Sequence, residues 1–176
     1  MNPDLYLRAL RFASLAHGDQ RMPDGDHPYL VHLASVAAEV IAALEAEPTN
    51  DADLAVACAL LHDVVEDTAT TIDRVEAEFG AAVAAGVLAL SKREEVPKVE
   101  RIADSLARIR QQPREVWMVK LADRVVNLTP PSPRHWSGDK RGAYRAQGEQ
   151  ILAVLEAASP HLAARLRLRI AQFPLE

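Results

Sequence analysis

Apolar residues recur every three or four positions along most of this chain, which is the spacing of one face of an α-helix. Near the N-terminus, for example, Leu5, Ala9, Phe12 and Ala16 repeat at this interval before Gly18. Hydrophobic residues make up 49% of the chain but aromatic residues only 5%, and this composition favours closely packed helices over a β-sandwich. The sequence therefore predicts an all-α protein.

Proline, glycine and capping residues divide this pattern into successive predicted helices. We expect helices over residues 3–17, 28–47, 54–65, 72–79, 81–91, 98–112, 115–128, 137–158 and 161–171. The polar segment 19–27 and the proline-rich segment 129–135 are expected to be loops. No internal repeat or linker interrupts the pattern, and a chain of 176 residues fits one domain, so we expect residues 1–176 to form a single domain.

Charge and cysteine content argue against several classes of protein. The net charge of −5 disfavours nucleic-acid binding, since a polyanion needs a basic face. Cys58 is the only cysteine, so we expect a buried thiol and a reducing cytoplasm. No signal peptide or bilayer-spanning run is evident, and we expect no contact with a membrane. Apolar residues of segment 81–90 or of the terminal helices could form a subunit interface, so the sequence does not exclude a homo-oligomer.

The chemistry of the chain is concentrated in the motif that runs from His62 to Asp67. On a continuous helix, Glu66 lies one turn beyond His62 and Asp67 lies one turn beyond Asp63. Burying unpaired carboxylates costs several kcal/mol, whereas a divalent cation gives each oxygen a partner. A mixed imidazole and carboxylate set suits Mn, Fe or Zn. The motif therefore predicts a divalent-metal site.

A second segment, from Lys120 to Leu128, repeats this arrangement. Asn127 follows Asp123 by one helical turn, so both segments offer a metal ligand and then a polar neighbour. The offset of about 5 to 6 Å places the second group beside a metal-bound water rather than on the metal. Glu66, Asp67 and Asn127 are therefore candidate proton acceptors or substrate-orienting residues.

Each of these residues has a commoner structural meaning when it is taken alone. A His-Asp dipeptide usually forms a cap or an ion pair at a helix end, and a histidine on an apolar stripe, such as His32, usually belongs to the core. An aspartate between two basic residues, as Asp123 is between Lys120 and Arg124, is typical of a surface ion pair. Their joint occurrence favours the metal site.

Together, these motifs resemble the RelA/SpoT-type alarmone hydrolase domain, particularly the small stand-alone members that include the metazoan SpoT homologues. The resemblance covers nearly the whole chain and rests on residues 16–21, 28–32, 59–68, 79–80, 119–128 and 136–144. It implies a compact multi-helix bundle of the HD-domain (HD/PDEase-like) fold. It also implies a Mn²⁺ ion bound by His32, His62, Asp63 and Asp123.

The activity implied by the resemblance is hydrolysis of the 3′-pyrophosphate of ppGpp or pppGpp, which yields GDP or GTP and pyrophosphate. In this family the HDxxED motif supplies water-activating carboxylates, which correspond to Glu66 and Asp67 here, and the family asparagine corresponds to Asn127. The substrate-binding positions that it implies are Arg21, Lys98, Lys120, Lys140 and Tyr144. Exposed lysines at helix ends more often do no more than contact solvent.

The chain departs from the family pattern at three places. Met22 stands where a second basic residue is common, Leu33 replaces the proline after the first metal histidine, and segment 129–134 has an unusual sequence. Because Met22 lacks the charge of that basic residue, the nucleotide preference is left open, and the alternative is a related hydrolase that acts on ppApp or on the 2′-phosphate of NADPH. A non-catalytic nucleotide sensor with a structural metal is a further alternative, against which the Glu66-Asp67 pair argues.

Overall fold

The computed structural model describes residues 1–23, 25–133 and 135–174, and within them the chain is helical. The elements are α1 (Pro3–His17), α2 (Leu30–Ala46), α3 (Ala52–Leu61), α4 (Val64–Asp67), α5 (Ile72–Phe79), α6 (Ala81–Leu90), α7 (Arg101–Ile109), α8 (Arg114–Asn127), α9 (Gly138–Leu155), a 3₁₀ turn η1 (Glu156–Ala158) and α10 (Pro160–Gln172). Among these residues the β-structure is limited to an isolated bridge between Arg21 and Pro28. The all-α prediction is confirmed.

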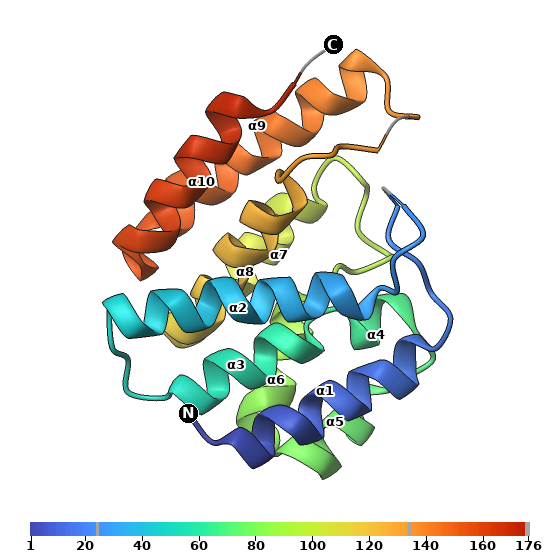
Figure 1. Cartoon of the computed structure of the whole chain (residues 1–176), viewed down its shortest axis with the longest axis vertical. Helices are drawn as coiled ribbons and strands as arrows, with labels where there is room; N and C mark the ends of the chain where they lie inside the picture. The colour runs from blue at the N-terminus through green and yellow to red at the C-terminus, as the bar shows by residue number, and fades with distance from the viewer. Residues whose placement is uncertain (24, 134, 175–176) are drawn as a thin grey trace.

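Helix α3 lies at the centre of the bundle, where α1, α2, α6 and α8 contact it. In Figure 1, α2 crosses the middle of the molecule, α1 and α5 lie on one side of it, and the α9–α10 pair lies on the other. Every residue from Leu54 to Leu61 is buried, including Cys58 as predicted. A helix that is covered on all sides needs apolar residues all round, which explains why this segment has no polar face.

Local interactions set many of the helix boundaries. The side chains of Asn2 and Asp51 cap α1 and α3, because each accepts a backbone N–H from the first helical turn. Gly80 separates α5 from α6 with a φ of 86°, a conformation that a Cβ atom disfavours. These residues marked boundaries in the sequence, so most predicted helix ends lie within a few residues of the observed ones.

The main difference from the predicted elements is a break at His62 and Asp63. The helix expected over residues 54–65 ends at Leu61, and Glu66 and Asp67 belong to the separate short helix α4. The imidazole Nδ1 of His62 bonds to the Ala59 carbonyl at 2.9 Å. A continued helix would use that same carbonyl to accept the N–H of Asp63, so the side chain competes with the helix.

Smaller differences lie elsewhere. Residues 98–100, expected in a helix, form a turn before α7, and the helix expected over 137–158 ends in η1. Segment 19–27 folds back on itself, since the N–H of Tyr29 bonds to the carbonyl of Gln20 at 2.9 Å. Asp24 and Arg134 of the two predicted loops lie outside the described residues. In the described part of the chain, no helix has the length and apolar character needed to span a membrane.

Candidate metal centre

Three buried side chains from three different helices converge at one point. His32 lies on α2, His62 at the end of α3, and Asp123 on α8. The Nε2 atoms of the two histidines are 3.4 Å apart, and Oδ1 of Asp123 lies 3.6 Å from His32 Nε2 and 3.7 Å from His62 Nε2. Donor atoms this close together, in a site only 3% to 6% exposed, form a set that can hold one metal ion.

The carboxylate of Asp63 completes this group. Its Oδ2 atom lies 2.9 Å from His62 Nε2 and 3.6 Å from His32 Nε2. The Tyr29 hydroxyl donates a hydrogen bond of 2.6 Å to the same oxygen. The structure thus brings together all four residues that the sequence suggested as ligands, and it adds Tyr29, one helical turn before His32, which the sequence reasoning did not single out.

Neighbouring hydrogen bonds orient these ligands. When the His62 ring is neutral, Nδ1–H donates to the Ala59 carbonyl and the lone pair of Nε2 faces the group. Lys120 Nζ donates to Asp123 Oδ2 at 3.0 Å, and the Asn127 side-chain amide donates to Oδ1 of the same carboxylate. Lys120 is buried in this ion pair, so its ammonium holds the candidate ligand Asp123 in place. Such outer partners commonly fix the direction of metal ligands.

Without a cation, protons must balance the negative charge of this group. Burial opposes a charge on His62, but Asp63 and Asp123 outweigh that effect and raise the pKa of the imidazole to about 10. Burial also acts to raise the pKa of Asp63, but His62 and His32 outweigh it and hold the pKa well below the ordinary value. A divalent cation would take over the role of these protons. The donor set, its burial and its charge therefore fit a divalent metal.

Metal affinity is expected to fall as the pH falls, because Nε2 of His62 must lose its proton before it can bind a cation. With a pKa near 10 in the metal-free protein, the apparent affinity should drop about tenfold for each pH unit below that value. Titration calorimetry with Mn²⁺ at several pH values, in buffers of different ionisation enthalpy, measures both the slope and the protons released. A pH-independent affinity without proton release would contradict this prediction.

The two carboxylates of α4 lie beside the ligands and have different partners. Gln20 Nε2 donates to Asp67 Oδ2 at 3.3 Å, whereas Glu66 accepts hydrogen bonds from the backbone N–H and the ammonium of Lys92. Burial and the nearby charge of Asp63 raise the pKa of Asp67. Asp67 is therefore a stronger proton acceptor than an ordinary exposed carboxylate.

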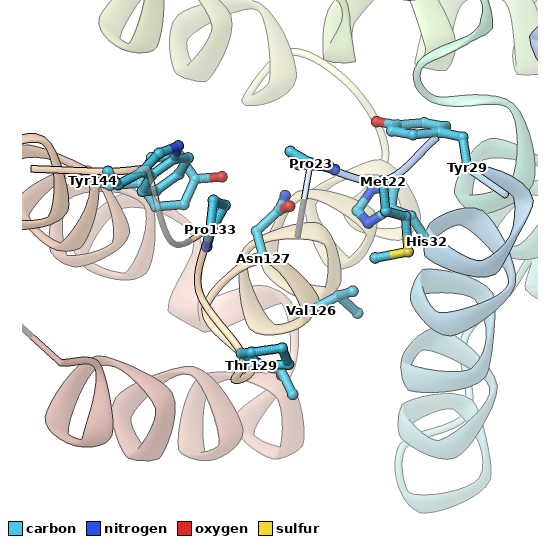
Figure 2. Close-up of a pocket in the computed structure, with 11 residues that line it drawn as sticks. Met22, Pro23, Tyr29, His32, Val126, Asn127, Thr129, Pro133 and Tyr144 are labelled. Carbon is cyan, nitrogen blue, oxygen red and sulfur yellow. The ribbon is translucent and has the colours of Figure 1, made fainter. Parts of the chain in front are cut away.

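A cavity rich in aromatic residues and a more polar cavity flank the group of candidate ligands. The first, of about 110 Å³, is lined by Met22, Pro23, Tyr29, His32, Val126, Asn127, Thr129, Pro131, Pro133, Trp136 and Tyr144. Figure 2 shows Tyr29 and His32 on one side of it, Asn127 in the middle and Tyr144 on the opposite side. The second, of about 210 Å³, is lined by Tyr29, Asp63, Glu66, Asp67, Lys92, Lys120, Asp123, Arg124, Asn127, Tyr144 and Gln147. The two cavities share Tyr29, Asn127 and Tyr144, so they lie next to each other.

The residues suggested for substrate binding occupy different places. Tyr144 lines both cavities, and Lys120 lines the polar one. Arg21 is exposed and bonds to the Asp26 carbonyl, Lys140 lies 4.5 Å from the centre of the Trp136 ring, and Lys98 is exposed in the turn before α7. These last three are absent from the lining of the two cavities.

Two cations of the polar cavity were not suggested by the sequence. Arg124 is 3% exposed, and its guanidinium lies 4.0 Å from the centre of the Tyr144 ring. Its position next to Asp123 was considered in the sequence only as part of an alternative surface ion pair. Lys92 comes from the segment between α6 and α7, and no pattern in the sequence links it to Glu66.

Comparison with known proteins decides the family. Residues 9–160 match the family model described as the HD domain. This chain belongs to the HD-domain family. Within it, guanosine-3′,5′-bis(diphosphate) 3′-pyrophosphohydrolase MESH1 of Danio rerio is 32% identical over 92% of this HD-domain chain and 89% of its own length. The MESH1 protein of Homo sapiens is 34% identical over 92% of this chain and 90% of its own length.

A solved structure agrees with this assignment. The structure of a metazoan orthologue of SpoT that hydrolyses ppGpp superposes on this HD-domain chain with a TM-score of 0.82 at 27% identity. The match covers 100% of this chain and 99% of the other. The resemblance to RelA/SpoT-type hydrolases and the HD-domain fold that it implied are therefore confirmed.

Proposed function

We propose that this chain is a Mn²⁺-dependent (p)ppGpp 3′-pyrophosphohydrolase, which yields GDP or GTP and pyrophosphate. The observation that carries the proposal is the group of two histidines and two aspartates, three of them buried, placed beside Glu66 and Asp67. Its support is the alignment of 92% of the chain with relatives named for this activity. We further propose a single domain, since one hydrophobic core runs from Ala9 to Phe173.

The residues around the site suit hydrolysis of a phosphate ester. A divalent cation held by His32, His62, Asp63 and Asp123 would supply Lewis-acid activation of water and of a phosphate oxygen. Asp67 accepts the proton of the attacking water, and Gln20 holds the Asp67 carboxylate in place. Asn127 lines both cavities, so it lies where a substrate would pass from one to the other.

The two cavities suit the two chemical parts of the substrate. The aromatic cavity offers the rings of Trp136 and Tyr144 to a nucleobase. In the polar cavity, four carboxylates face Lys92, Lys120 and Arg124, which is a net charge of −1 from these side chains. A divalent cation changes this sum to +1, so phosphate groups are attracted once the metal is bound.

Turnover of ppGpp tests the proposed activity directly. The purified chain, loaded with Mn²⁺, is expected to release pyrophosphate and GDP, which anion-exchange chromatography separates. Chelation should stop the reaction and added Mn²⁺ should restore it, because the cation supplies the water-activating charge. A metal-loaded protein that leaves ppGpp intact would refute the assigned substrate.

Met22 motivates a second candidate substrate. It lines the aromatic cavity, where a thioether contacts adenine as readily as guanine and forms no ion pair with a phosphate. We therefore include ppApp and NADPH in the same assay. If kcat/KM for either compound exceeds that for ppGpp, that compound replaces ppGpp as the preferred substrate, and the proposed metal site is unaffected.

A further inference from the structure

Glu66 is held on both of its oxygens by a residue that lies 26 positions along the chain. The backbone N–H of Lys92 donates to Oε2 at 2.7 Å, and the ammonium of Lys92 donates to Oε1. The Glu66 side chain is 19% exposed, so this contact lies at the edge of the polar cavity. Each carboxylate oxygen can still accept a second hydrogen bond, which leaves Glu66 able to bind water.

The segment that carries Lys92 is itself anchored. Ser91, the preceding residue, bonds through its hydroxyl to the Val87 carbonyl at 2.9 Å. Its own carbonyl accepts a hydrogen bond of 2.8 Å from Arg108, which also bonds to the carbonyl of Ala89 at the end of α6. A chain of contacts therefore runs from α7 through Ser91 to the backbone of Lys92 and on to Glu66.

The surroundings of Glu66 explain why it needs such a partner. Asp63, Asp67 and Asp123 line the same cavity, and their charges repel a further carboxylate. The other two cations of the cavity are engaged elsewhere, since Lys120 pairs with Asp123 and Arg124 bonds to the Tyr144 carbonyl. Lys92 is thus the cation that the structure pairs with Glu66.

We propose that Lys92 is a positioning residue, which keeps the Glu66 carboxylate directed into the polar cavity so that it orients the attacking water. The inference rests on the proposed function, because it assumes that the cavity hosts hydrolysis. Lys92 acts through Glu66 and makes no contact of its own with the reacting phosphate. Because the ammonium also counts in the charge of the polar cavity, its loss is expected to lower kcat by a larger factor than it raises KM.

Steady-state kinetics of the Mn²⁺-loaded protein test this role. Lys92→Met and Lys92→Gln both remove the ammonium and keep the backbone N–H that bonds to Glu66. We expect kcat to fall on the order of 10- to 100-fold in both, because a mobile carboxylate no longer orients the water. Lys92→Arg should restore kcat to within about fivefold of wild type, since a guanidinium can donate to the same oxygen.

The neighbouring Arg93 offers a matched control. It lies in the same segment, and its guanidinium is 3.8 Å from Asp104. Arg93→Met removes one positive charge from the same segment and should leave kcat and KM within about twofold of wild type. If Arg93→Met and Lys92→Met lower kcat equally, general charge rather than positioning explains the effect and the proposal is wrong.

A double-mutant cycle separates positioning from direct substrate contact. If Lys92 acts through Glu66, Lys92→Met should not slow a Glu66→Gln protein further. An equal loss in both backgrounds would overturn the proposal, as would a raised KM with unchanged kcat. Turnover of ppGpp by the wild-type protein is measured first. If the wild-type protein does not hydrolyse ppGpp, the proposed substrate is wrong. The same double-mutant cycle is then measured with bis(p-nitrophenyl) phosphate, whose hydrolysis needs water activation but no nucleoside.

Discussion

Replacement of His62 by alanine is expected to abolish tight binding of the divalent metal and to lower kcat/KM for ppGpp by about 10³-fold or more. The imidazole Nε2 lies within 3.7 Å of a donor atom of each of the other three proposed ligands, so its loss opens the centre of the group. The activation of water and the neutralisation of phosphate charge are together worth several kcal/mol, and each 1.36 kcal/mol corresponds to about a tenfold change in rate.

Metal content measured by mass spectrometry, together with the rate, checks this prediction. His161→Ala is a matched control, because His161 lies on α10 and its backbone N–H bond to Glu47 survives the substitution. We expect this control to bind metal and to turn over ppGpp like the wild type. A His62→Ala protein that retains one tightly bound metal per chain and full activity would refute the assigned site.

Replacement of Gly86 by valine is expected to have the largest effect on stability. A Cβ atom at this position would lie 2.6 Å from Cys58 Sγ and 3.0 Å from a methyl group of Val116. Helix α6 therefore packs against α3 and α8 at a distance that only a hydrogen atom allows. Overpacking of this kind costs about 3 kcal/mol, which corresponds to a fall in Tm of about 6 to 12 °C for a chain of this size.

Gly142 provides the control for this experiment. It also lies inside a helix, α9, but a Cβ atom there would meet no atom within 4 Å. Gly142→Val should therefore change the free energy of unfolding by less than about 0.5 kcal/mol. Addition of Cys58→Ala to a Gly86→Ala protein should recover part of the lost stability. Urea unfolding curves that show equal stability for the two valine variants would contradict the packing argument.

Much of the fold could be predicted because its causes are local. The spacing of Leu5, Ala9 and Phe12 places them on one helix face, and Asn2 and Gly18 bound that helix through interactions within a few residues. The predicted buried thiol of Cys58 likewise followed from its apolar neighbours. The break after Leu61 could not be predicted, because a single side-chain hydrogen bond from His62 competes with an otherwise favourable helix.

The candidate metal centre likewise has features that the sequence predicts and features that depend on the tertiary structure. The sequence alone pointed to the candidate metal ligands, through the joint occurrence of imidazole and carboxylate groups on apolar segments and through the family resemblance. The tertiary structure decided the distant partners, since Tyr29 bonds to Asp63 and Lys92 to Glu66, whereas Lys120 and Asp123 lie three residues apart on α8. Helical periodicity repeats every few residues, whereas the partner of a buried charge depends on how distant helices pack, and no local pattern in the chain records that packing.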